Sequence, residues 1–221
     1  MESAATRLEE VCANIARVCK PARRETADVT LIAVSKTHPA ERIEPLLEAG
    51  HRVFGENRVQ EAQGKWPALR EAYPDVELHL IGQLQSNKAD DAVALFDVIH
   101  SLDRPSLLKA LAAAMDKSDK RVPCFVQVNI GDEEQKGGCA IADLPAFLEQ
   151  VRASGIPVAG LMCIPPADIE PAPFFALLAK LAKDNGLDGL SMGMSGDYET
   201  AVMLGSTHVR VGTALFGARG A

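Results

Sequence analysis

The chain has 221 residues, of which 47% are hydrophobic, 24% charged and only 5% aromatic. This length and composition fit a globular domain with an aliphatic core and argue against a disordered chain. Thirty acidic residues against twenty-three basic ones give a net charge of −7, which repels nucleic-acid phosphates. We therefore expect no nucleic-acid partner.

The spacing of cysteines and histidines and the hydropathy of the chain bear on its cellular compartment, on membrane association and on metal binding. The five cysteines are scattered and form no C-x-x-C pair, and the five histidines show no metal-binding spacing. The first residues lack the basic-then-apolar pattern of a signal peptide, and no apolar run approaches the ~18 residues of a membrane span. The sequence thus predicts a cytoplasmic protein with no membrane partner and no metal.

Local patterns predict a helix followed by alternating strands and helices. Leu8, Val11, Ile15 and Val18 recur at helical spacing, and Pro21 ends this N-terminal helix. Short β-branched runs predict eight strands, at Val29–Lys36, Arg52–Asn57, Glu77–Gly82, Asp97–Asp103, Val122–Ile130, Val158–Ile164, Gly189–Ser195 and His208–Gly217. Seven helical segments are expected between them, including Pro39–Gly50, Val59–Tyr73, Pro105–Lys117, Leu144–Ser154, Pro171–Asp184 and Asp197–Leu204.

The order of these elements predicts the fold. Strands such as 31–34 and 124–128 are almost continuously apolar, as parallel strands covered on both faces are. No linker divides the chain, so we expect residues 1–221 to form one domain, a compact (β/α)₈ barrel of the TIM type. The extra N-terminal helix would fill the place of the missing last helix. An open doubly wound sheet is the alternative, but no G-x-G-x-x-G follows the first strand.

A lysine ends the first predicted strand. Active sites of such barrels lie at the C-terminal ends of the strands. Alternation places Ile32, Val34 and Lys36 on one face, so if the first two fill the interior, Lys36 projects into the mouth. A partly desolvated amine there could attack a carbonyl group. The alternative is a strand-end lysine that reaches solvent.

The ends of strands seven and eight form a second candidate region. Ser195 stands at or near the start of a helix, and Gly212 and Thr213 supply backbone and a hydroxyl on the neighbouring strand. Barrels often bind a phosphate at this pair of loops. Two acids in the first turn of the helix count against it, and an ordinary helix cap is the alternative. Arg210 shares a face with Gly212 and would form an ion pair or face an electron-rich ligand atom.

Five motifs, in this order along nearly the whole chain, carry a family resemblance. The motifs are Leu31–Thr37 (LIAVSKT), Phe54–Glu61 (FGENRVQE), His79–Lys88 (HLIGQLQSNK), Leu190–Ser195 (LSMGMS) and His208–Gly217 (HVRVGTALFG). With these motifs the chain resembles the pyridoxal phosphate homeostasis proteins, whose barrel is related to the N-terminal domain of alanine racemase.

The resemblance implies pyridoxal 5′-phosphate (PLP) as cofactor, held as a Schiff base on Lys36. It further implies that the phosphate is bound by Ser195, Gly212 and Thr213, with the Met194 backbone nearby. Asn57 would contact the ring side, and Arg210 would face the pyridine nitrogen.

The resemblance also implies that the chain is not an enzyme. The C-terminal β domain of alanine racemase-like enzymes, with its acid/base tyrosine, is expected to be absent, which favours a monomer. An arginine at the pyridine nitrogen weakens the cofactor as an electron sink. The expected function is a carrier and regulator of PLP that releases it to apo-enzymes in transient contacts. The alternatives are a PLP-dependent amino-acid racemase or decarboxylase, or a Schiff-base aldolase.

Overall fold

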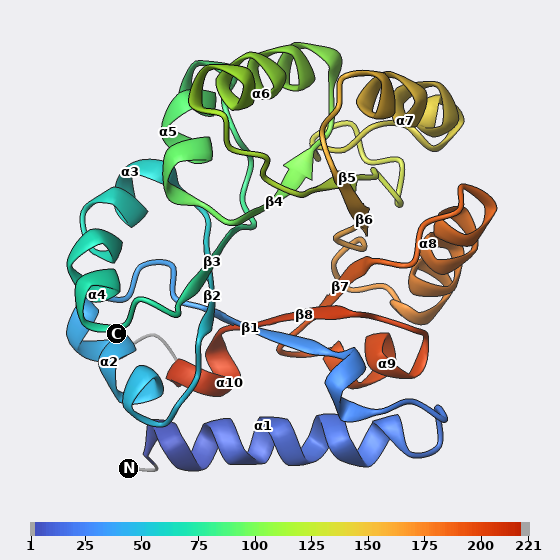
Figure 1. The fold of residues 1–221 in the computed structure, drawn as a ribbon. Helices are drawn as coiled ribbons and strands as arrows, with labels where there is room; N and C mark the ends of the chain where they lie inside the picture. The colour runs from blue at the N-terminus through green and yellow to red at the C-terminus, as the bar shows by residue number, and fades with distance from the viewer. Residues whose placement is uncertain (1–2, 218–221) are drawn as a thin grey trace.

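The computed structural model describes residues 3–217. Eight parallel strands form a closed barrel in chain order, with helices outside it (Figure 1). The ring closes where β1 pairs with β8, in the register Thr30 to His208 and Ile32 to Arg210. The strands are β1 (Thr30–Val34), β2 (Val53–Glu56), β3 (Glu77–Leu80), β4 (Val98–Leu102), β5 (Cys124–Gln127), β6 (Val158–Met162), β7 (Leu190–Met194) and β8 (His208–Val211). The predicted TIM-type barrel is confirmed, and the open sheet is wrong.

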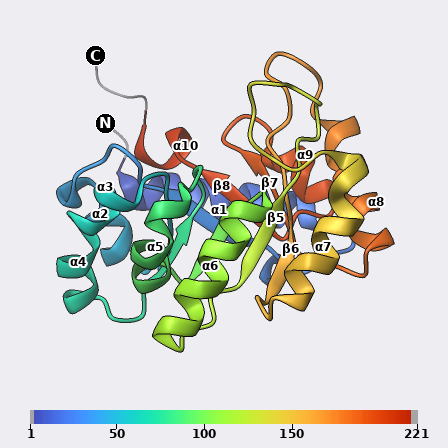
Figure 2. The same ribbon diagram turned by 90° about the horizontal axis from the view of Figure 1, so that it is seen from above.

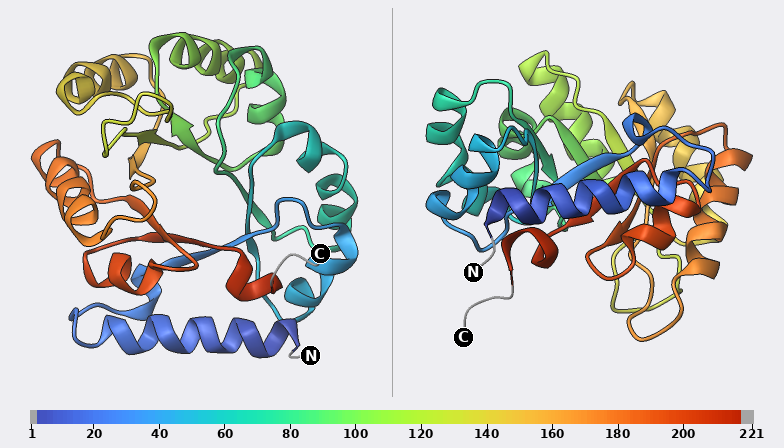
Figure 3. Two further views of the ribbon diagram at one scale, coloured as in Figure 1. Left: turned by 180° about the vertical axis from the view of Figure 1, so that it is seen from behind. Right: turned by 90° about the horizontal axis from the view of Figure 1, so that it is seen from below.

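The N-terminal helix completes the outer ring. Helix α1 (Ala4–Cys19) begins after Ser3, whose hydroxyl accepts the Thr6 N–H, and its apolar stripe is buried. It lies across β1 and β8 and packs against α2, α9 and α10 (Figure 3). The other helices are α2 (Ala40–Glu48), α3 (Val59–Gln63), α4 (Trp66–Ala72), α5 (Ala89–Leu95), α6 (Pro105–Ser118), α7 (Leu144–Ala153), α8 (Ala172–Asp184), α9 (Tyr198–Met203) and α10 (Thr213–Phe216), with short 3₁₀ turns at Thr26–Asp28, Ser86–Lys88 and Ile141–Asp143.

Two predicted elements differ from the structure. The single helix expected over Val59–Tyr73 is two helices, because Pro67 lacks the N–H that would continue the first helix and stands near the start of α4. The last strand ends at Val211, six residues earlier than predicted. The residues after it form α10, which packs against α1 and buries Leu215 and Phe216.

Side chains fill the barrel interior, and those of Ile32 and Ile81 lie close to the backbone of β2 at Gly55. A Cβ on Gly55 would lie 2.7 Å from Ile32 Cγ2 and 3.1 Å from Ile81 Cδ1, so only glycine lets these two isoleucines meet over β2. Ile32 therefore points inward, as the alternation of β1 predicts. Figure 2 shows the loops after β5 and β6 rising together on one side of the barrel.

No helix within residues 3–217 has the length and apolarity required to cross a membrane. The same residues contain no cluster of three or more His, Cys, Asp or Glu side chains placed to hold a metal ion.

Candidate functional site

A cavity of about 290 Å³ lies where β1, β2, β7 and β8 end. All seven residues that the sequence predicts for the site line it together. They are Lys36, Asn57, Met194, Ser195, Arg210, Gly212 and Thr213; Val34, Ile81, Ile164 and Gly196 complete the lining. Pockets for small molecules start near ~300 Å³, so this one suits a ligand of a single ring with a few substituents.

The backbone around Lys36 is fixed by groups on the neighbouring helices. Lys36 is half-buried, and Thr37 after it adopts a left-handed conformation with φ 63°, which is strained for a β-branched residue. The Thr37 N–H donates to Glu61 Oε1 at 2.5 Å. Lys65 Nζ donates to the carbonyls of Ser35 at 2.9 Å and His38 at 3.0 Å. These bonds hold the backbone of the strained turn that contains Lys36.

A buried carboxylate lies beneath this turn. Glu56 is fully buried, and its Oε1 accepts hydrogen bonds from Ser35 Oγ at 2.6 Å and Trp66 Nε1 at 3.0 Å. Lys65 Nζ lies 2.8 Å from the same oxygen, while Oε2 has no hydrogen-bond partner. The charge of Glu56 is therefore balanced by Lys65, which leaves the Lys36 amine free of this acid.

Glu61 is the second acid that Lys65 contacts, at 3.0 Å. Burial raises the pKa of Glu61, but the hydrogen bonds from Lys65 and from the Thr37 N–H outweigh it and hold the pKa below its usual value. Glu61 is thus ionised at neutral pH and anchors the Thr37 backbone as an acceptor.

The ends of β7 and β8 are tied together by Ser195. Its hydroxyl accepts the Gly212 N–H at 3.1 Å. Ser195 does not cap α9; that position belongs to Asp197, whose carboxylate instead accepts the Met194 N–H at 2.6 Å. The simple helix-cap alternative for Ser195 is therefore wrong. The hydroxyl lies between two strand ends, on the wall of the cavity.

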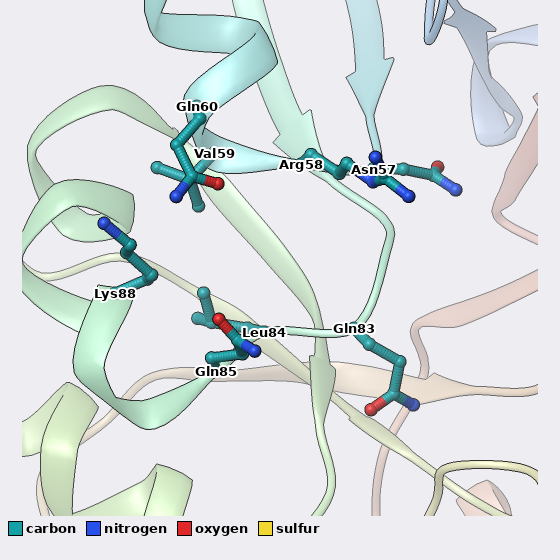
Figure 4. A pocket seen from close by; sticks show the side chains of 8 residues that line it. All are labelled: Asn57, Arg58, Val59, Gln60, Gln83, Leu84, Gln85 and Lys88. Carbon is teal, nitrogen blue, oxygen red and sulfur yellow. The ribbon is translucent and has the colours of Figure 1, made fainter.

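Asn57 is placed by contact with the loop after β3. A Cβ on Gly82 would lie 2.3 Å from the Asn57 carbonyl oxygen, so the two backbones approach as closely as glycine allows. Asn57 also lines a second pocket with residues such as Arg58, Gln83 and Lys88. Figure 4 shows Lys88 and Asn57 on opposite sides of that pocket. Asn57 thus forms the partition between this pocket and the cavity that holds Lys36.

Arg210 is almost fully buried and carries its charge into the same cavity. Its Nη1 donates to Ser191 Oγ at 2.6 Å and its Nη2 to the Cys163 carbonyl at 2.9 Å. Burial lowers the pKa of the guanidinium, although arginine remains charged in proteins. Arg210 forms no salt bridge with any residue the structure describes, so the structural ion pair considered for it is wrong.

The donor set of the cavity fits an anionic, electron-rich ligand. Its lining has one primary amine, one guanidinium, two hydroxyls and one amide, and none of the described lining residues is acidic. A phosphate dianion and a pyridine nitrogen both accept hydrogen bonds, and an aldehyde reacts with an amine. The residues therefore fit PLP: Ser195, Gly212 and Thr213 would hold the phosphate, Arg210 the ring nitrogen and Lys36 the aldehyde carbon.

Several residues that support the site were not singled out from the sequence. Glu56 and Lys65 are separated by nine residues and a helix break, so no periodicity joins them. His79 and His100, which show no motif spacing in the sequence, are both fully buried inside the barrel. The alternation of Glu77, His79 and Ile81 along β3 was the available signal, because Ile81 shares that face and lines the cavity.

The interior histidines make stability fall in mild acid. Burial lowers the pKa of His208 to about 4 and that of His100 well below its usual value. In the unfolded chain these histidines bind protons below about pH 6.5, whereas in the folded chain they stay neutral to a lower pH. Their contribution to the free energy of unfolding is therefore fully present above pH 6.5 and is lost as the pH falls toward 4. We expect each histidine to contribute at most about 1.4 kcal/mol per pH unit, measured by urea unfolding at pH 7, 6 and 5.

The control for this effect is His208→Phe, which removes one titrating ring. Its unfolding free energy should fall less steeply than that of the wild type between pH 7 and 5. Parallel pH profiles for the two proteins would contradict the assignment to His208.

Solved structures show the class of protein to which this barrel and cavity belong. PipY of Synechococcus elongatus, solved with PLP bound, is 40% identical, with a TM-score of 0.81 over 92% of this chain and 100% of PipY. The family model of the alanine racemase N-terminal domain matches residues 7–220. The fold is therefore the barrel of that domain.

Full-length relatives narrow the class further. The pyridoxal phosphate homeostasis protein of Pseudomonas aeruginosa is 40% identical over 225 residues, which cover 99% of this chain and 97% of that protein. The protein of the same name from Escherichia coli K12 is 36% identical over 99% of this chain and 98% of its own length. The chain belongs to the pyridoxal phosphate homeostasis protein family, within the alanine racemase N-terminal domain family. The resemblance read from the five motifs is confirmed.

Proposed function

We propose that this protein binds PLP and acts in PLP homeostasis, holding the cofactor as a Schiff base on Lys36 without turning over amino acids. The observation that carries the proposal is the shared cavity of Lys36, Arg210 and the three phosphate-binding candidates. The names of the relatives and the PLP-bound structure of PipY support it. PLP supplies an aldehyde, which condenses with an amine to give a Schiff base and water.

The roles of the chain's own residues follow from their positions. Lys36 presents its amine from the end of β1, and Ser195, Gly212 and Thr213 present hydroxyl and N–H donors from the ends of β7 and β8. Asn57 would contact the ring side of the cofactor, and the Met194 backbone would lie near the phosphate. Arg210 would donate to the pyridine nitrogen and keep it unprotonated, because a cation next to that atom opposes a second positive charge. A cofactor held in this way is a poor electron sink, which favours storage over turnover.

The remaining parts of the proposal concern organisation and partners. We propose that residues 1–221 act as one domain and as a monomer in the cytoplasm, and that the bound PLP passes to apo-enzymes in transient encounters. Met194 is a large apolar side chain exposed at the edge of the cavity, where an acceptor would approach.

Titration of the pure protein with PLP tests the proposal. We expect a visible Schiff-base absorption band at one equivalent of PLP and no racemisation or decarboxylation of amino acids above the rate of free PLP. Sustained turnover would establish the racemase or decarboxylase alternative. Absence of any PLP binding would point to an aldolase that uses Lys36 directly.

Thr213→Val tests the phosphate site. The substitution keeps the shape of the side chain and removes the hydroxyl, so PLP should bind about 1–3 kcal/mol more weakly. The measurement is the dissociation constant from absorbance titration. Thr200→Val on α9 is the matched control, because Thr200 is not among the residues that line the cavity. Equal affinities of Thr213→Val and wild type would remove Thr213 from the site.

A further inference from the structure

A chain of hydrogen bonds crosses the barrel interior behind Arg210. Ser191 Oγ, which accepts from Arg210, lies 2.8 Å from His100 Nδ1, and His100 Nε2 lies 2.8 Å from His79 Nδ1. The chain runs from β8 to the adjacent β7, crosses the interior to β4 and reaches the adjacent β3. Ser191, His100 and His79 are all fully buried, so no solvent competes for these bonds.

The far end of the chain is an acid at the other mouth of the barrel. His79 Nε2 lies 2.8 Å from Glu77 Oε1, and the Glu77 side chain is 49% exposed. The hydrogen bond from His79 lowers the pKa of Glu77, which keeps this acid ionised at neutral pH. The two ends of the chain are therefore a buried cation and a half-exposed anion.

These ends allow only one direction of donation. A guanidinium can only donate and a carboxylate can only accept. Glu77 can only accept, so His79 carries its proton on Nε2, and a neutral His79 ring accepts at Nδ1 from His100 Nε2. A neutral His100 ring then accepts at Nδ1 from the Ser191 hydroxyl, whose oxygen also accepts from Arg210. Both rings are neutral in this arrangement, in agreement with the strongly lowered pKa of His100.

We propose that Ser191, His100 and His79 are positioning residues for Arg210, joining it to Glu77 through hydrogen bonds that all point the same way. The inference rests on the proposed function, in which Arg210 faces the cofactor ring. Hydrogen bonds in series polarise one another, so such a chain can stabilise the charge of a buried cation that has no carboxylate next to it. The acid, Glu77, lies at the opposite mouth of the barrel, so the described lining of the cavity contains no acid. Two of the guanidinium N–H groups bond to Ser191 and to the Cys163 carbonyl, and the others remain for a ligand.

Other titratable groups around the chain do not offer an alternative acceptor. His208 packs in the same layer, 5.9 Å from His100 between ring centroids, but its Nδ1 pairs with Thr207 Oγ1. The Cys163 carbonyl accepts from Arg210 Nη2, and no hydrogen bond is found between Asp197 and Arg210 among the described residues. Burial raises the pKa of the Cys163 thiol to about 12, so it is neutral at pH 7.

Nitrogen NMR of histidine in the PLP-free protein tests the direction of the chain. We expect both His79 and His100 to be protonated on Nε2 and unprotonated on Nδ1 in the folded protein. A proton on Nδ1 of either ring, or an imidazolium at pH 7, overturns the inference. This measurement needs no cofactor, so it tests the direction of the hydrogen bonds even if the wild-type protein does not bind PLP. Failure to bind PLP would reject the proposed function and leave the direction of the hydrogen bonds to be decided by the NMR result.

Variants test the effect on Arg210. His100→Phe keeps a ring against Phe125, which stacks on His100 at 4.4 Å, but it breaks the chain. We expect this variant and Ser191→Ala to bind PLP about tenfold more weakly. His100→Gln retains an acceptor and a donor and should recover most of the affinity. His208→Phe changes a half-buried histidine outside the chain, so it is the matched control and should stay within about twofold of wild type.

Wild-type affinity in both His100→Phe and Ser191→Ala, each with a cooperative thermal transition, would reject the positioning role. If His100→Phe does not fold, the tautomers in the wild type and the affinity of Ser191→Ala still decide between the outcomes.

Discussion

Lys36→Ala should abolish the visible absorption band that PLP gives with the wild-type protein. The band requires an imine, and Lys36 is the one primary amine among the described residues that line the cavity. Arg210 lies in the same cavity but is held as a cation and is no nucleophile. The proposed phosphate-binding groups after β7 and β8 are untouched, so the variant should still bind PLP without a covalent link.

Two measurements separate loss of the link from loss of the site. Absorbance titration reports the imine, while fluorescence quenching or dialysis reports bound PLP. After borohydride reduction, the wild-type protein should carry the cofactor on the peptide that contains Lys36, and the variant should carry none. Lys88→Ala is the matched control, because this lysine lines the adjoining pocket and not the cavity (Figure 4). A full band in Lys36→Ala would move the covalent site to another lysine.

Lys65→Met should destabilise the fold by about 3–5 kcal/mol. Methionine fills most of the volume of the buried lysine stem but leaves the Glu56 carboxylate without a countercharge. Glu56 is fully buried and one of its oxygens already lacks a partner, so the loss cannot be offset by rearranged bonds to Ser35 and Trp66 alone. Urea unfolding at pH 7 measures the change.

The same substitution should also loosen the turn that follows β1. Lys65 holds the carbonyls of Ser35 and His38, on either side of Lys36, so the yield of the Schiff base at one equivalent of PLP should fall. Lys117→Met is the control: Lys117 pairs with Asp90 where both side chains are more than half exposed, and its loss should cost less than about 1 kcal/mol. A Lys65→Met protein as stable as wild type would contradict the stabilising role given to the contact between Lys65 and Glu56.

The sequence predicts the barrel and its reactive face because both depend on local, repeating signals. Alternation along β1 places Lys36 on the face of Ile32 and Val34, and parallel strands bring their C-terminal ends to one mouth. Residues on strands far apart in sequence, such as Lys36 and Thr213, are therefore expected to meet. The cavity lining agrees with this expectation for all seven predicted residues.

Features that depend on tertiary contacts were not predictable in this way. The helical turn of α10 exists because Leu215 and Phe216 are buried as it packs against α1, which no pattern within ten residues reveals. Likewise, the role of Glu56 depends on Lys65 and Trp66 reaching it across a helix break. A histidine pair joined across two strands gives no spacing signal, because its hydrogen bonds depend on strand register.

The pairing of β1 with β8 has a consequence for how the site is assembled during synthesis. In the proposed site the amine is that of Lys36, whereas Arg210, Gly212 and Thr213 belong to the last strand and the residues directly after it. A growing polypeptide that still lacks β8 therefore lacks one wall of the cavity. We expect PLP to bind only after β8 has been made and paired with β1, and fragments that end before residue 208 to bind none.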